Sequence, residues 1–173
     1  MPRLLILLFL TTSFFVSTTN QACAQESPYR PAKKEEIVGF WQLVPLAEAR
    51  KPHEIIPDPW PSMCQWFAYY DDGSLKTIDK LHEPCDKFSD VSLGETMKDI
   101  PSVVSWEYHA PALISVKRSD VKNYFELWEV TYVTEAFPKE SPEFLPGDLI
   151  LYLRNPKINK LLYIRHLRRL NNE

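Results

Sequence analysis

The stretch EIVGFWQLV, residues 36–44, alternates along its length and is rich in β-branched and aromatic residues, a pattern typical of a β-strand. A proline-rich loop follows it, to about residue 63. The chain has 15 prolines and only 4 glycines. Proline cannot donate to a sheet ladder and disrupts helix interiors, so the proline clusters mark loops and the runs between them are candidate strands.

Seven further runs of strand-favouring residues follow the first. Two hairpin signals join neighbouring runs, at Asp71-Asp72-Gly73 and at Asn155-Pro156-Lys157, and only residues 87–99 suggest a short helix or a loop. Short connections imply antiparallel neighbours, and eight such strands most naturally form a meandering barrel or a sandwich. The sequence therefore predicts an all-β domain with at most one short helix. The seven runs are Cys64–Tyr70, Ser74–Lys80, Ser102–His109, Leu113–Arg118, Lys122–Glu135, Asp148–Arg154 and Lys160–Leu170.

The N-terminus predicts export. Arg3 precedes the apolar run Leu4–Leu10, and Ala22-Cys23-Ala24 is a small-residue cleavage site, which together indicate a signal peptide over residues 1–24. The apolar run is too short for a membrane-spanning helix, which needs about 20 residues. We expect a secreted or periplasmic protein, with residues 25–35 as a flexible lead-in and residues 36–170 as one domain. The alternative is a lipoprotein anchored at Cys23, although Asn20 is unusual for a lipobox.

Cleavage would leave two cysteines, Cys64 and Cys85. In an oxidising compartment such a pair predicts one disulfide, and the alternative is two free thiols. The net charge of −3 argues against a nucleic-acid binder, which would carry a basic excess. No second apolar segment is long enough to cross a bilayer, so no transmembrane segment is expected in the mature chain.

The chain carries no recognisable catalytic motif. Its four histidines are dispersed, and a disulfide at Cys85 would remove the thiol from any cluster with His82, so neither a metal site nor a cofactor is predicted. Glu107 and Glu126 fall on strands and could be interior carboxylates suited to acid–base chemistry. Carboxylates on antiparallel strands more often face solvent, so we expect both on the outer face.

Gly39-Phe40-Trp41 on the first strand, together with a basic residue on the last strand, resembles the lipocalin-like family, particularly its bacterial exported members of unassigned function. The resemblance implies an eight-stranded up-and-down barrel. It also implies that Trp41 packs across the closed end, with Gly39 as the other structural residue of the Gly-x-Trp motif. An arginine from the last strand would cover this indole, and the candidates are Arg165 and Arg168.

A lipocalin-like barrel implies that a small apolar or amphipathic ligand binds inside it. Aromatic residues two apart on a strand share a face, and rings with a polar edge suit such a site, although the same rings could simply fill the core. An alternative is a protein-interaction or inhibitor module in the cell envelope, acting through the loop 45–62 with its proline-flanked Trp60. A weaker third hypothesis is a small-barrel isomerase. The predicted ligand-binding residues are Trp66, Tyr70, Trp106, Tyr108, Trp128 and Tyr132.

Overall fold

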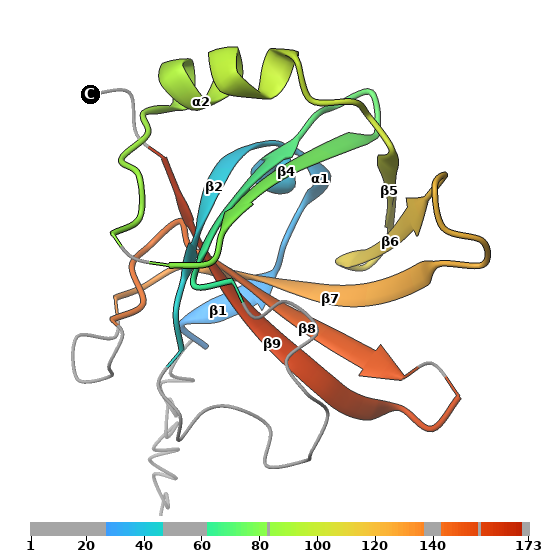
Figure 1. The fold of residues 1–173 in the computed structure, drawn as a ribbon. Coiled ribbons are helices and arrows are strands. Elements are labelled where there is room, and N and C mark those ends of the chain that lie inside the picture. Colours follow the sequence, from blue (N-terminus) through green and yellow to red (C-terminus); the bar gives the residue numbers. More distant parts are fainter. Residues whose placement is uncertain (1–26, 47–61, 83, 137–142, 156, 171–173) are drawn as a thin grey trace, which may run out of the picture.

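The computed structural model describes residues 27–46, 62–82, 84–136, 143–155 and 157–170. Within these ranges the chain forms nine strands and two short helices (Figure 1). The predicted strands all appear, trimmed by one to three residues at several ends, and residues 36 and 37 belong to a helix instead. The elements are β1 (Tyr29–Pro31), α1 (Lys34–Ile37), β2 (Gly39–Val44), β3 (Cys64–Tyr69), β4 (Ser74–Lys80), α2 (Asp90–Lys98), β5 (Val104–His109), β6 (Leu113–Arg118), β7 (Phe125–Val133), β8 (Leu149–Asn155) and β9 (Lys160–Arg169).

Strands β2 to β9 form a closed antiparallel barrel. From β2 to β9 each strand pairs with the next one along the chain, including β7 with β8. The ring is closed because the first of these strands, β2, also pairs with the last, β9. The predicted fold class is thus confirmed, with two short helices where the sequence predicts at most one. Strand β1 lies alongside the end of β7, where Tyr29 pairs with Val133.

Trp41 closes one end of the barrel. Its side chain is fully buried, and its indole Nε1 donates to the carbonyl of Ile37 at 2.8 Å. The arginine over the ring is Arg169, whose guanidinium carbon lies 5.1 Å from the ring centroid and which donates to the carbonyl of Val38. The prediction of Arg165 or Arg168 for this position is therefore wrong, because the β2–β9 register places Arg169 directly opposite Trp41.

Gly39 makes this arrangement possible. Its φ of +142° is strained for a residue with a side chain. A Cβ atom at this position would lie only 2.5 Å from a guanidinium nitrogen of Arg169. The glycine therefore lets the last strand bring its arginine over the indole of the first.

Residues 25–35 are not a flexible lead-in where the structure describes them. Ala32 is buried in the barrel core, as is Ile37 just after the segment, so the described residues 27–35 contribute to this core. Arg30 forms an ion pair with Glu36 and lies over the ring of Tyr132, 4.6 Å from its centroid. Burial of apolar side chains and the pairing with β7 order a segment that its prolines and charges predict to be loose.

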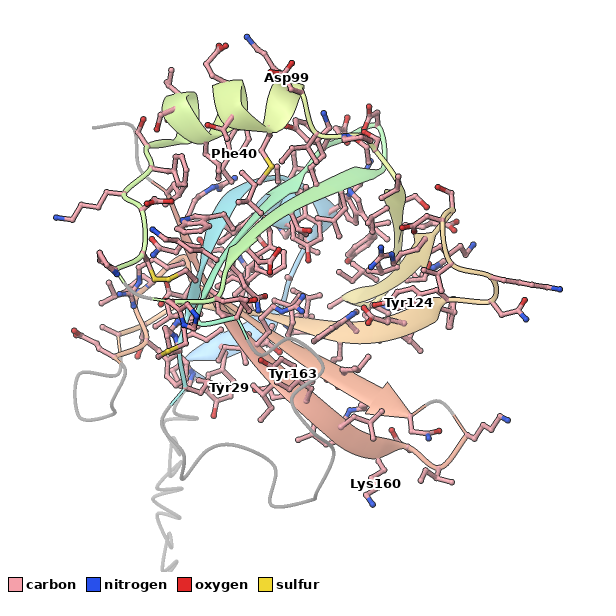
Figure 2. All side chains as sticks on the ribbon, viewed as in Figure 1. Tyr29, Phe40, Asp99, Tyr124, Lys160 and Tyr163 are labelled. Atoms are coloured by element: carbon pink, nitrogen blue, oxygen red, sulfur yellow. A yellow bond between two sulfur atoms is a disulfide. The ribbon has the colours of Figure 1, made fainter. Side chains whose placement is uncertain are left out.

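Helix α2 lies over β2 and β4 (Figure 1), and its buried side chains also pack with those of β3. It begins after Ser89, whose hydroxyl accepts from the backbone N–H of Ser92. Leu93 and Met97 are fully buried in a second apolar cluster that also contains Trp66. Figure 2 shows Phe40, a member of the same cluster, beneath the helix.

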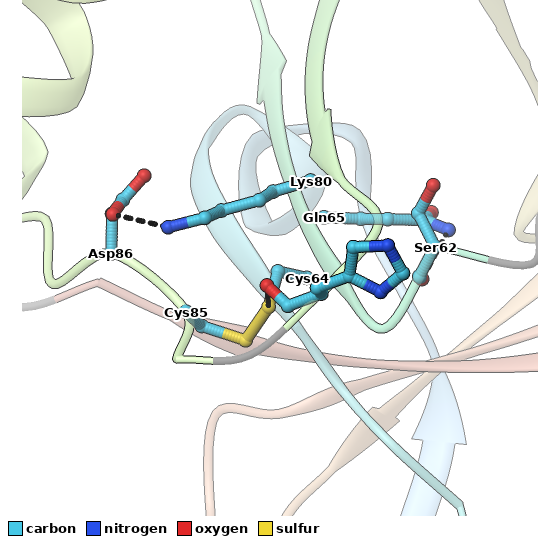
Figure 3. The surroundings of a disulfide bond; sticks show 7 residues. Ser62, Cys64, Gln65, Lys80, Cys85 and Asp86 are labelled. Carbon is cyan, nitrogen blue, oxygen red and sulfur yellow. Dashed lines mark hydrogen bonds and ion pairs between the residues drawn. A yellow bond between two sulfur atoms is a disulfide. The ribbon is translucent and has the colours of Figure 1, made fainter.

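The disulfide between Cys64 and Cys85 is confirmed, with the two Cα atoms 5.4 Å apart. It ties the start of β3 to the segment between β4 and α2. Figure 3 shows the bridge near the ion pair of Lys80 and Asp86, whose Nζ and Oδ1 atoms are 3.0 Å apart. The bridge thus fastens the segment that leads into α2 to the barrel wall.

Several predictions lie outside the described residues. They are the signal peptide of residues 1–24, the lipidation alternative at Cys23 and Trp60 with most of its loop. Across the described part of the chain, no helix has both the length and the apolar character needed to span a bilayer.

Candidate functional site

A cavity of about 330 Å³ opens at the end of the barrel opposite Trp41. Strands β4 and β5 pair over only two residue pairs, Ser74 with Ser105 and Leu75 with Val104. The later residues of β4 are therefore free of β5 and form one wall of the cavity, through Thr77 and Asp79. This parting of two neighbouring strands gives the barrel interior access from outside.

Arg165 is one of four residues with charged side chains that line this cavity, with Asp79, Arg118 and Glu126. It points inward from β9 and is only 5% exposed. Its guanidinium carbon lies 4.6 Å from the ring centroid of Phe67 and 4.5 Å from that of Trp128. Two aromatic faces thus hold the guanidinium plane between them and offset part of the cost of burying its charge.

Glu126 lines the same cavity from β7. One carboxylate oxygen accepts from the Tyr124 hydroxyl and the other accepts from Trp128 Nε1 at 2.9 Å. Figure 2 shows Tyr124 close to the beginning of β7. Because both oxygens already hold donors, Glu126 serves as a fixed acceptor that orients Tyr124 and Trp128. The expectation that Glu126 faces solvent is therefore wrong, whereas the Glu107 side chain is 65% exposed.

Two tyrosine hydroxyls in the cavity wall stay protonated over the physiological range. Burial raises the pKa of Tyr69 to about 12, and the charge of Arg165 offsets part of that rise. Burial, followed by the hydrogen bond to Glu126, also raises the pKa of Tyr124. Both hydroxyls are thus neutral hydrogen-bond donors at pH 7, and that of Tyr124 donates to Glu126.

The remaining wall is mixed in character. Leu75, Val104 and Val116 supply apolar surface near the β4–β5 gap. At the rim, Arg118 lies 5.7 Å from the Tyr124 ring centroid and forms an ion pair with Asp120 at 2.7 Å. Apolar surface beside a deeply placed guanidinium can hold a molecule that has both an apolar part and an anionic group.

Of the six predicted ligand-binding residues, Trp128 alone lines this cavity. Trp66 and Tyr70 point to the outer face and pack in the cluster under α2, so their assignment to the barrel interior is wrong. Trp106 and Tyr108 do face inward, but their polar atoms bond the chain itself. Trp106 Nε1 donates to the carbonyl of Tyr70, and the Tyr108 hydroxyl donates to that of Ala32, both at 3.0 Å.

Tyr132 also lies away from the cavity, under the guanidinium of Arg30 near the closed end. The cavity residues that sequence reasoning missed are Phe67, Tyr69, Tyr124 and Arg165, the last of which was considered only as a cover for Trp41. Strand alternation groups Phe67 with Tyr69, but it does not say that this pair, rather than Trp66, faces inward. No signal in the sequence marks Arg165 as an interior residue.

No group of three potential metal ligands occurs among the residues that the structure describes. Comparison with known proteins found no matching family model, no matching curated protein and no matching solved structure. The chemistry of the cavity is therefore the basis on which a function can be proposed.

Proposed function

We propose that this protein is an exported, lipocalin-like carrier that binds a small amphipathic anion in the open end of its barrel. The observation that carries the proposal is Arg165, held between Phe67 and Trp128 in the wall of the cavity. A guanidinium presents several N–H donors in one plane and matches carboxylate or phosphate oxygens in pairs. The apolar wall at Leu75, Val104 and Val116 would take the ligand's hydrocarbon part.

The lipocalin-like assignment has its own support. The closed eight-stranded barrel has Trp41 across its closed end and Arg169 over that indole, as the family resemblance implies for a last-strand arginine. Export is supported by the sequence of residues 1–24 and by the Cys64–Cys85 disulfide, a bond that persists in oxidising compartments.

The test compares three ligands that share one chain length: decanoate, decanol and decyltrimethylammonium. We expect decanoate to bind with one-to-one stoichiometry in isothermal titration and the other two to bind more weakly. The Arg165→Met variant should weaken decanoate binding by about tenfold to a hundredfold, the range for loss of a charged hydrogen bond, and leave decanol binding unchanged. Arg154→Met on β8 removes an arginine outside the cavity lining and should not affect decanoate binding.

Two results would count against the proposal. One is the absence of saturable binding of all three ligands by a protein whose circular dichroism is that of a folded barrel. The other is decanoate affinity that is equal in the wild type and in Arg165→Met. Thermal melts of both variants would separate a lost ligand contact from a lost fold.

A further inference from the structure

Exposed apolar side chains gather at the cavity end of the barrel. Among the described residues, seven large apolar side chains are exposed. Two of them lie elsewhere, Tyr29 on β1 and Val91 on α2. The other five lie at or beside the open end. They are Met63, Leu81, Val121, Phe125 and Ile158, with exposed fractions of 48%, 59%, 41%, 52% and 66%.

Three of these residues sit in or next to two neighbouring connections. Val121 lies in the β6–β7 connection, Phe125 is the first residue of β7, and Ile158 lies in the β8–β9 connection. Strand β7 pairs with β6 on one side and with β8 on the other, so the two connections lie at the same end of the barrel. Figure 1 shows both projecting to the right of the molecule. We call residues 117–125, 154–155 and 157–160 together the basic rim.

The rim is strongly basic although the chain is acidic. The rim contains six lysine and arginine residues and one acid, Asp120, whereas the whole chain has a net charge of −3. Arg118 and Arg154 form ion pairs with Asp120 and Glu129. The exposed lysines are Lys117, Lys122, Lys157 and Lys160, and Figure 2 shows Lys160 at the end of the barrel that carries this rim.

We propose that the basic rim docks on the surface of an anionic lipid membrane. Apolar side chains that reach below the headgroups, flanked by lysines that meet anionic headgroups, are the features by which peripheral proteins bind such surfaces. A soluble polyanion would use the lysines and leave Val121, Phe125 and Ile158 without a role. Docking in this orientation also turns the cavity toward the lipid, so an amphipathic anion could pass between bilayer and barrel.

This inference goes beyond ligand binding and does not depend on it. The test is co-sedimentation with vesicles of phosphatidylcholine alone, or with one third phosphatidylglycerol. The protein is purified in the form that the expressing cell produces, and mass measurement defines its N-terminus, which is the same in all variants. We expect binding to the anionic vesicles only, and marked weakening in about 1 M salt, where the screening length falls to about 3 Å.

Two double variants test the two parts of the surface. Lys122→Glu/Lys157→Glu should weaken partitioning of the protein onto the anionic vesicles by well over tenfold, because each positive charge lost lowers the partition coefficient by about fivefold. Phe125→Ser/Ile158→Ser should weaken it by a similar factor without changing the charge. The matched controls on α2, Lys98→Glu and Val91→Ser, should bind as the wild type does.

Several outcomes would overturn the proposal. One is equal binding to both kinds of vesicle, and another is an equal effect of the rim variants and the control variants. A third is binding to polyphosphate that is as tight as binding to vesicles and is unchanged in Phe125→Ser/Ile158→Ser. Arg165→Met leaves the rim intact and should keep full vesicle binding. A failure of decanoate binding and a failure of membrane docking are therefore distinguishable.

Discussion

At the residue scale, one buried carboxylate connects the end of the chain to the loop before β8. Asp148 has a side chain only 3% exposed, and it accepts from His166 Nε2 at 2.7 Å and from Arg168 at 2.9 Å. The backbone N–H of Leu145 donates to the same carboxylate. Arg168, a candidate for covering Trp41, thus holds Asp148 instead, because alternate β9 residues point out of the barrel.

Asp148 predicts a pH-dependent contribution to stability. Burial by itself would raise the pKa of Asp148, but the hydrogen bonds from His166 and Arg168 outweigh it and the pKa lies below its usual value. A lowered pKa in the folded state means that the stabilisation is complete above the ordinary pKa of about 3.9 and is lost as the pH falls through the folded-state value.

We expect Asp148→Asn to lower the free energy of unfolding by about 2 kcal/mol at pH 7, because it leaves Arg168 and His166 beside a neutral amide. Urea unfolding at a series of pH values measures this. The difference in the free energy of unfolding between wild type and variant should stay constant from pH 7 to about 5 and become smaller below about pH 4. A gap that widens toward acid would contradict this account. The exposed pair partner Asp86 provides a control, since Asp86→Asn should change stability by less than about 0.5 kcal/mol.

At the element scale, strand β3 shows why alternation did not locate the site. All six of its residues are buried, because the barrel core covers one face and α2 covers the other. Alternation distinguishes a core face from a solvent face, and it carries no such information when both faces are covered. Trp66 and Phe67 are equally apolar neighbours, and only the position of α2 decides which of them is outside the barrel.

Other elements were predictable to different extents. The hairpin turn at Asp72-Gly73 and the order of eight strands follow from local residue chemistry, and the structure confirms them. The pairing of Trp41 with Arg169 depends on the register between the first and last barrel strands, which no local pattern fixes. Arg165 faces inward on β9 because Leu167 and Arg169 do, a consequence of that same register.

The disulfide yields a prediction for the α2 layer. Cys64 and Cys85 are 21 residues apart, and a bridge of this span contributes about 3 kcal/mol in the chain-entropy model. The Cys64→Ser/Cys85→Ser variant should therefore lose about 3 kcal/mol in chemical unfolding, and reducing agent should lower wild-type stability to the same level. Decanoate binding to the folded variant should persist, since neither cysteine lines the cavity. Equal stability with and without reductant would contradict the prediction.

At the scale of the whole molecule, the two ends of the barrel are built differently. At one end Trp41, Ala32 beside β1 and Ile37 of α1 are buried in the barrel core and stabilise the fold. The other end has a gap between β4 and β5, a cavity of about 330 Å³ and the basic rim, from which Arg118 and Tyr124 line the cavity. The proposed ligand site and the proposed membrane surface therefore lie at one end of the barrel, away from Trp41 and Arg169.

The most direct measurement is a crystal structure of the protein with decanoate. The account predicts the carboxylate within hydrogen-bond distance of the Arg165 guanidinium and the alkyl chain against Leu75, Val104 and Val116. Decanoate seated under α2 against Trp66, or an empty cavity at a decanoate concentration that saturates binding in solution, would contradict it.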